Sequence, residues 1–353
     1  MRALRRHRPV QLPRQDGMKV ASGFASAPQA SRELAEQAVT SALAAADLKQ
    51  ANHVLLLLSR EFSRHAAEAI RAAARTAGCL QVSGCTASGL LTEAGWLLDQ
   101  PAAVALVIGD LAAATTTATP TISFCGRPTL PVDWQNDRTR AGLLETDALT
   151  WSHGRLTASA CAETTLPGLS GRVIRAGGQR LLYSQLTVDT CSAYELRRVA
   201  GLSAVDSLRR ALPAEARDTM PLHRLSVMTD ADAPPIAILA AHADGSLTLA
   251  SALTEGQQIA WAMRQPLAAE EEMRRLLSAE SAAPPAFALM FSCIGRGPLF
   301  YGNEDRDLHT FRQHFPGVPL LGAYGGGQIA PTPAGNRLYH NTAITLLYRS
   351  HHV

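Results

Sequence analysis

The sequence lacks the features that define membrane-spanning, secreted and zinc-binding proteins. Its longest unbroken aliphatic run is Val54–Leu58, far short of the roughly 20 apolar residues that a membrane-spanning helix needs. Its six cysteines form no Cys-x-x-Cys pair and no Cys/His spacing of the zinc type. No apolar segment follows the N-terminal arginines, so no secretory signal is expected. These absences predict a cytoplasmic protein with reduced thiols, no metal site and no membrane partner.

Charge is also scarce, and the small basic surplus is local. Charged residues make up 18% of the chain and hydrophobic residues 46%, which is enough for a packed core and excludes a disordered protein. Residues 1–17 hold five arginines and one aspartate (+4), so the other 336 residues contribute −1 to the net charge of +3. A nucleic-acid binder carries its surplus on the folded domain, so no nucleic-acid partner is predicted.

The first 17 residues are expected to lie outside the folded core. They contain prolines and no apolar periodicity, which is typical of a disordered basic leader or of sequence upstream of a true start at Met18. A polyanion-binding arm is the alternative. The chain has only two lysines and many alanines, a composition typical of a GC-rich bacterial genome.

Length and patterning predict two domains of mixed α/β (α+β) class. At roughly 150 residues per domain, 353 residues suggest two, which we place at 18–213 and 214–353, with Pro213–Pro221 as the linker. Both halves alternate strand and helix patterns, so we expect layered β-sheets partly covered by helices, for example in an αββα arrangement. The expected helices are 31–47, 63–77, 192–201, one ending near 212, 267–278 and 303–315. The clearest strands are 18–24, 54–58, 102–108, 286–291 and 318–324, with a hairpin at 172–184 around Gly177 and Gly178.

Three glycine-containing bends, each following an apolar strand, are the candidates for chemistry. The first bend leads into a hairpin rather than a helix, so it is not a phosphate loop. It offers a cup of hydroxyl, thiol and amide groups, or else it is a tight strand connection. Its candidate ligand-binding residues are Ser83, Cys85, Thr86 and Ser88.

The second bend places an arginine between two glycines. Such an arginine can offer its planar guanidinium to a carboxylate, or it can pair with a nearby acid of the protein. The candidate residues are Ser292, Cys293, Gly295 and Arg296. The third bend lacks the Gly-x-Gly-x-x-Gly order and a following helix, so it is either part of the site or a wide corner. Its candidate residues are Tyr324, Gly326 and Gln328.

These bends resemble the signatures of the FIST (F-box and intracellular signal transduction) family. Gly84-Cys85-Thr86-Ala87-Ser88-Gly89 is similar to FIST N-terminal domains, and Ser292-Cys293-Ile294-Gly295-Arg296-Gly297 is similar to FIST C-terminal domains. Val318–Pro331 also resembles the C-terminal domain, except that Gln328 stands where the family often has glutamate. The resemblance covers about residues 18–348. It implies a sensory, ligand-binding protein of signal transduction, without established catalytic chemistry.

The resemblance and the bends leave three functional hypotheses. The first is a sensor that binds a small ligand, such as an amino acid or a carboxylate, between its two domains, with Arg296 holding an acidic group. It would signal through another protein, and some members act on a histidine kinase. The second is a haem-binding nitric-oxide sensor that regulates a histidine kinase, with His340, His242 or His153 as axial ligand. The third is a thiol-dependent enzyme that uses Cys85 or Cys293. No catalytic residue is assigned, because a binding protein is favoured over an enzyme.

Overall fold

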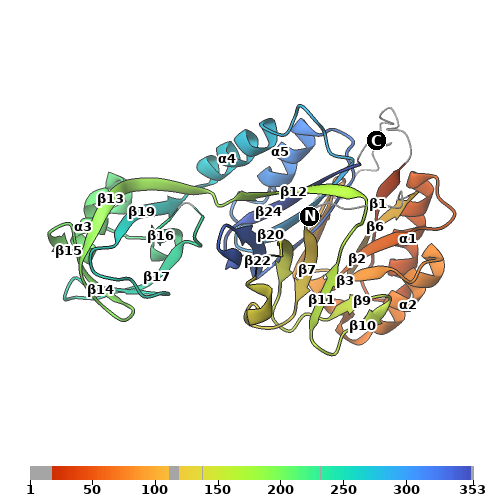
Figure 1. Cartoon of the computed structure of the whole chain (residues 1–353), viewed down its shortest axis with the longest axis horizontal. Coiled ribbons are helices and arrows are strands. Elements are labelled where there is room, and N and C mark those ends of the chain that lie inside the picture. The colour runs from red at the N-terminus through yellow and green to blue at the C-terminus, as the bar shows by residue number, and fades with distance from the viewer. Residues whose placement is uncertain (1–17, 111–118, 137, 231, 351–353) are drawn as a thin grey trace. The chain divides into compact units, whose positions relative to one another are not determined.

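The computed structural model describes residues 18–110, 119–136, 138–230 and 232–350 (Figure 1). The predicted leader at 1–17 lies outside the described residues. The chain forms two compact units, one made of Met1–Ala176 and Met273–Val353 and the other of Gly177–Glu272. The mixed α/β class predicted from the sequence is confirmed, with both helices and sheets in the structure. None of the helices in the described ranges is long and apolar enough to cross a membrane.

The first half of the first unit begins with alternating strands and helices. Its elements are β1 (Lys19–Ser26), α1 (Arg32–Ala46), β2 (His53–Ser59), η1 (Arg60–Arg64), α2 (Ala66–Ala77), β3 (Val82–Ala87), β4 (Gly89–Thr92), β5 (Gly95–Leu98) and β6 (Ala102–Gly109). Strand β2 is buried on both faces because its leucines alternate between two cores. Leu56 and Leu58 pack with α1 and α2, whereas Leu55 and Leu57 face a second core shared between sheets.

The second half repeats the same order of elements. It consists of β12 (Leu169–Ala176), α4 (Pro266–Ser278), β20 (Phe287–Cys293), α5 (Arg306–His314), β21 (Leu320–Gly325), β22 (Gly327–Thr332), β23 (Gly335–Tyr339) and β24 (Ala343–Ser350). The part of α4 before Met273 belongs to the second unit. The strand order β1-β6-β2-β3 of one sheet matches β12-β24-β20-β21 of another. In both, the last two strands are parallel and the other neighbours are antiparallel. The first unit is therefore built from two copies of one pattern.

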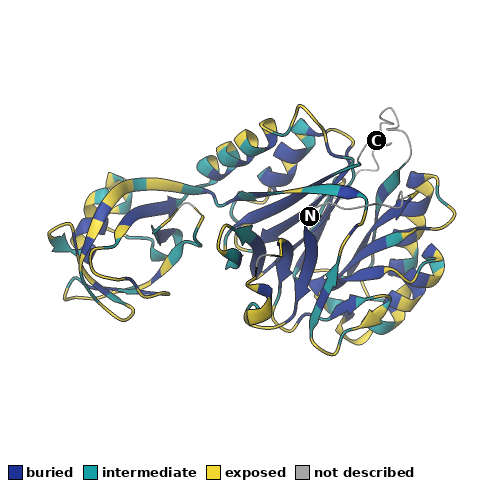
Figure 2. Ribbon diagram, in the orientation of Figure 1, coloured by how far each residue is buried: buried dark blue, intermediate teal, exposed yellow. Residues whose placement is uncertain are grey.

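Helices lie outside and sheets inside, as the αββα expectation requires. One core lies between α1, α2 and the first sheet, and another holds the buried faces of α4 and α5 against the sheet of β20. The largest core joins the inner faces of the sheets. Figures 1 and 2 show these strands as buried ribbons with helices α1 and α2 on the outside of one sheet.

A third sheet completes the first unit. It has the order β11-β7-β8-β22-β23 and is formed by β7 (Thr121–Cys125), β8 (Arg140–Leu144) and β11 (Cys161–Thr164) with β22 and β23. A short helix η2 (Val132–Trp134) joins β7 to β8, and β9 (Thr150–Ser152) and β10 (Arg155–Leu156) extend the first sheet beside β3. Strand β4 pairs with β21, so the two halves of the chain are joined by a common sheet.

The second unit has a core of its own. Its elements are β13 (Gln179–Ser192), β14 (Glu195–Val199), β15 (Leu202–Ser203), α3 (Ala204–Ala211), η3 (Ala214–Ala216), η4 (Leu222–Arg224), β16 (Leu225–Met228), β17 (Ile236–Ala241), β18 (Leu247–Leu249) and β19 (Gln258–Arg264). Their apolar side chains pack around the buried Trp261. Pro213–Pro221, expected to be the linker, lies inside this unit. The division at 18–213 and 214–353 itself stays a prediction about sequence domains.

Three local predictions were wrong. The expected hairpin at 172–184 does not form, because β12 pairs with β24 and β13 pairs with β19, so Gly177 and Gly178 mark the passage between the units. The expected helix from Ser192 is strand β14, because its backbone groups pair with β13 and β18 and tertiary pairing overrides the local capping pattern. Helix α5 is capped by Asp305 rather than by Asn303, since the Asp305 carboxylate accepts from the Leu308 N–H at 2.8 Å.

Candidate functional site

Two single residues carry the chain from one sheet to the next. Ser88 separates β3, in the first sheet, from β4, in the second. Gly326 separates β21, in the second sheet, from β22, in the third. The two residues occupy the same position in the repeated order of elements, and each belongs to a bend that the sequence singled out. The three sheets of the first unit therefore meet at these two crossings.

Glu145, the first residue after β8, joins the two crossings. The Ser88 hydroxyl donates to Glu145 Oε1 at 2.6 Å, and the Gly326 N–H donates to Glu145 Oε2 at 2.6 Å. Gly325 allows this approach, since a Cβ there would lie 2.8 Å from Glu145 Oε2. Sequence reasoning missed Glu145 because it lies in the proline- and threonine-rich stretch 111–170, where no pattern marks a site. The first and third bends thus share one half-buried carboxylate.

The second bend is joined to the third through the backbone. The Ile294 N–H donates to the Gly325 carbonyl at 3.0 Å, directly after Cys293 ends β20. A Cβ at the exposed Gly295 would lie 3.1 Å from Asn341 Oδ1, and Cys293 Sγ lies 3.9 Å from the same oxygen. The neighbouring His340 is exposed, and its Nδ1 donates to the Gly326 carbonyl at 2.8 Å. The three bends therefore lie together in the first unit.

Arg296 points away from this surface. Its Nε lies 2.7 Å from Asp307 Oδ2 and its Nη2 lies 3.1 Å from Asp307 Oδ1, and its side chain is 1% exposed. The Tyr301 hydroxyl donates to the same carboxylate at 2.9 Å. The structure thus shows the second of the two possibilities for Arg296, an arginine paired with an acid of the protein, and it gives no support to a role in holding an acidic ligand.

Tyr324 belongs to the same buried network. Its hydroxyl donates to Asp305 Oδ2, and burial, with the nearby Asp307 charge, raises the pKa of Asp305 to about 6. A Cβ at Gly297 would lie 2.6 Å from the Tyr324 ring, so glycine is needed there for the ring to pack. Tyr324 therefore stabilises the interior beside α5 and contributes no accessible hydroxyl.

Several other residues of the predicted set are also buried. The Thr86 hydroxyl accepts from the Leu149 N–H at 3.0 Å, and burial, followed by the Glu145 charge, raises the pKa of Cys85 well above its usual range. Gln328 Nε2 donates to the Gly325 carbonyl at 3.3 Å. The buried members of the predicted set are Ser83, Cys85, Thr86, Ser292, Cys293, Arg296, Tyr324 and Gln328. The accessible part is smaller, and we call it the junction site: Ser88, Glu145, Gly295, Gly326 and His340.

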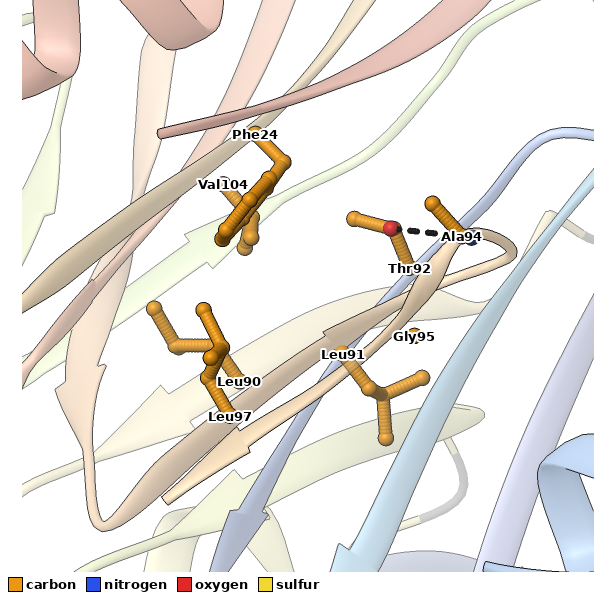
Figure 3. A pocket seen from close by; sticks show the side chains of 8 residues that line it. All are labelled: Phe24, Leu90, Leu91, Thr92, Ala94, Gly95, Leu97 and Val104. Carbon is orange, nitrogen blue, oxygen red and sulfur yellow. Dashed lines mark hydrogen bonds between the residues drawn. The ribbon is translucent and has the colours of Figure 1, made fainter. Parts of the chain in front are cut away.

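Two cavities lie elsewhere. Figure 3 shows one of about 10 Å³, room for one water molecule, with mostly apolar walls from Phe24, Leu90, Leu91, Thr92, Ala94, Gly95, Leu97 and Val104. A second, of about 350 Å³, lies in the second unit and is lined by Leu202, Asp206, Arg209, Arg210 and Arg217. Neither is lined by residues of the predicted site.

The histidines proposed as haem ligands do not fit that role in this structure. His340, His242 and His153 are all exposed, and each has a ring nitrogen bonded to a neighbouring polar atom: Gly326 O, Thr248 Oγ1 and Ser152 Oγ. An axial haem ligand needs an apolar pocket beside it. No cluster of three or more metal-ligating side chains occurs in the part of the chain that the structure describes.

Comparisons with known proteins place this geometry in a family context. Residues 204–331 match the family model of the FIST C domain, which includes the second and third bends. The resemblance to FIST-domain proteins is thereby confirmed for this part of the chain, and a separate N-terminal FIST domain stays a prediction.

The curated relatives share limited segments with this chain. An uncharacterized protein of Mycobacterium tuberculosis is 30% identical over 107 residues, which is 30% of this chain and 28% of the relative. An uncharacterized protein of Mycobacterium bovis gives the same identity and coverage. The human protein F-box only protein 22 is 42% identical over 64 residues, 17% of this chain and 15% of its own length. The matched segments thus span less than a third of these relatives.

Proposed function

We propose that the chain is a sensory protein of signal transduction that binds a small ligand bearing an amino group at the junction site. The observation that supports this most directly is the Glu145 carboxylate, held by Ser88 and Gly326 from the two halves of the repeat. A carboxylate has about four lone-pair positions, and these two hydrogen bonds use two of them. The half-buried carboxylate therefore retains capacity to accept from a ligand ammonium group.

An amino acid is the ligand class that fits the junction site best. Glu145 would accept from its ammonium group, and the exposed His340, whose Nδ1–H donates to Gly326, would offer Nε2–H to its carboxylate as the imidazolium, the form in which both ring nitrogens are donors. In this arrangement His340, and not Arg296, binds the carboxylate of the ligand, because the Arg296 guanidinium is already paired with Asp307. The exposed Gly295 and Gly326 add no side chains that would obstruct the approach. A signalling protein such as a histidine kinase stays a hypothesis for the partner, from the family resemblance.

The other two hypotheses have less support. A haem sensor requires a buried histidine, and the three proposed ones are exposed. A thiol enzyme requires a readily formed thiolate, and burial beside Glu145 disfavours the thiolate of Cys85. Cys293 has Asn341 Oδ1 as its neighbour at 3.9 Å, which is not a general base.

The test is a thermal-shift screen of the full chain against amino acids, amines and organic acids. A ligand that binds only the folded protein raises its melting temperature with concentration. We expect an amine-bearing compound to do so, and Glu145→Gln to weaken its binding about 10-fold or more, as loss of a charged hydrogen bond should. Glu33→Gln, at an exposed pair with Arg32, is the matched control. Stabilisation by organic acids alone, or equal binding by Glu145→Gln, would contradict the proposal.

A further inference from the structure

Two cysteines that no functional hypothesis uses lie side by side in the third sheet. Cys161 of β11 is the direct cross-strand partner of Cys125 of β7, and their sulphurs are 3.7 Å apart. The Gly126 N–H donates to the Ala160 carbonyl at 2.7 Å in the adjacent pair. In an antiparallel ladder, hydrogen-bonded and non-hydrogen-bonded pairs alternate, so the cysteines form a non-hydrogen-bonded pair, a kind of pair in which the Cα atoms are typically about 4.5 Å apart. That separation lies within the range that a disulfide spans.

The other cysteines have different surroundings. Cys79 Sγ donates to the Asn52 carbonyl at 3.0 Å, and Cys191 Sγ donates to the Leu253 carbonyl at 3.2 Å. Cys85 is buried in β3. All six are free thiols in the structure. Cys161 is partly exposed while Cys125 is buried, so a small oxidant can reach one member of the pair from solvent.

We propose that Cys125 and Cys161 are a site of reversible oxidative modification, where a hydroperoxide converts the two thiols into a cross-strand disulfide. The Cys161 thiolate attacks one peroxide oxygen, the O–O bond breaks, and Cys161 becomes a sulfenic acid while the leaving oxygen is protonated. The Cys125 sulphur then attacks the sulfenic sulphur, and the S–O bond breaks. The hydroxyl leaves with the Cys125 proton as water. With hydrogen peroxide the products are one disulfide and two waters, and two electrons pass from sulphur to oxygen.

The surroundings of the pair set the speed of this reaction. Burial, together with the neighbouring Cys125, raises the pKa of Cys161 to about 12. The thiolate is the attacking species, so oxidation is slow at neutral pH and accelerates as the pH rises. Bond formation also requires the sulphurs to close from 3.7 Å to the roughly 2.05 Å of a disulfide, which side-chain rotation and a small strand movement must supply.

The experiment uses the full chain, reduced and then treated with hydrogen peroxide at pH 7 and pH 9. Remaining thiols are alkylated, and peptides are analysed by mass spectrometry without reduction. We expect one linked species joining the Cys125 and Cys161 peptides, removed by dithiothreitol and formed about 100-fold faster at pH 9, because the thiolate fraction of a thiol with a pKa of about 12 rises tenfold per pH unit. The oxidised protein should also melt at a higher temperature, because the bond constrains the unfolded chain.

Three variants make the result decisive. Cys161→Ser should abolish the linked species and the rise in melting temperature, and it replaces the partly exposed member, which lowers the risk of misfolding. Cys125→Ser should do the same, and Cys293→Ser, outside the pair, should change neither. Alkylation of both cysteines after oxidation of the wild-type chain would overturn the proposal, as would a disulfide that joins either one to another cysteine.

Discussion

The two crossings of the first unit have the same architecture and different chemistry. At β3–Ser88–β4 a side-chain hydroxyl reaches Glu145, whereas at β21–Gly326–β22 a backbone N–H reaches the same carboxylate. The repeated order of elements therefore supplies the geometry twice. The residue type at each crossing decides whether a side-chain hydroxyl or a backbone N–H contacts the carboxylate.

One pair of glycines is common to both halves. Gly84 lies opposite Leu56 in the parallel pair β2–β3, and Gly322 lies opposite Met290 in β20–β21. A Cβ would lie 1.7 Å from the Leu56 carbonyl oxygen at the first position and 2.1 Å from the Met290 carbonyl oxygen at the second. The close approach of the paired strands thus recurs at corresponding positions, which indicates that the backbone, not a ligand, requires these glycines.

The largest loss of stability should come from adding a side chain at either of these glycine positions. Gly84→Ala and Gly322→Ala force a methyl group into a backbone oxygen that cannot move without separating two central strands. We expect each to destabilise the protein by more than about 5 kcal/mol, so that little folded protein is recovered. Circular dichroism and urea unfolding measure this. Gly177→Ala, where the nearest atom to the added Cβ is 3.9 Å away, should be nearly neutral. If one of the first two variants unfolded the protein and the other did not, the two halves would not be structurally equivalent.

The second-largest loss of stability should come from replacing the arginine that follows β20, compared with the arginine that follows β2. Arg60 pairs with Asp99 at 3.2 Å on the surface, where both side chains are mostly exposed, whereas Arg296 and Asp307 are buried. Arg296→Ala leaves a buried aspartate without its ion-pair partner and should cost about 3–5 kcal/mol. Arg60→Ala should cost less than about 1 kcal/mol. Urea denaturation of the two variants gives both numbers.

The same comparison has an internal check. The double variant Arg296→Met with Asp307→Leu removes both buried charges and should be more stable than Arg296→Ala alone, because no uncompensated charge remains. If Arg296→Ala is no more destabilising than Arg60→Ala, the buried pair does not hold α5 in place, and Arg296 regains its standing as a ligand-binding residue.

Much of the first unit could be predicted from local patterns. The continuous apolar run at β2 and the amphipathic helix α1 follow directly from side-chain periodicity, and both formed where the pattern placed them. The hairpin expected around Gly177 failed because the strands of 172–184 find their partners about 80 or more residues away, at β19 and β24. Local turn chemistry carries no information about such distant pairing.

The site could be predicted only in part, for a similar reason. The glycines marked the three bends correctly as places where backbone and side chains approach closely. The direction in which Arg296 points, however, depends on Asp307, which the sequence shows only as one of several acids at the start of a helix. Glu145 becomes visible only when three sheets meet, since Ser88 and Gly326 are 57 and 181 residues from it in sequence.

The smallest expected effect concerns the helix caps of the two halves. Helix α5 begins at the buried Asp305, while α2 begins at His65 without a side-chain cap. Asp305 faces Asp307, Arg296, Tyr324 and Leu308 N–H, and burial raises its pKa from 3.8 to about 6. Because the folded pKa lies above the unfolded one, the folded state holds this proton more tightly. The contribution of Asp305 to stability is complete below about pH 4 and declines as the pH rises through 6.

Asp305→Asn isolates that contribution, since its Oδ1 can still accept from Leu308 N–H, its Nδ2 can donate to the Tyr324 hydroxyl, and it does not titrate. We expect the free energy of unfolding of the wild-type chain, relative to the variant, to fall by about 2–3 kcal/mol between pH 4 and pH 7. Urea unfolding at several pH values measures the difference. Glu93, whose pKa burial also raises, is present in both proteins and cancels. A difference that is flat with pH, or that grows as the pH rises, would mean that Asp305 is ionised throughout, and that the cap of α5 acts as a fixed negative charge beside Arg296 and Arg312.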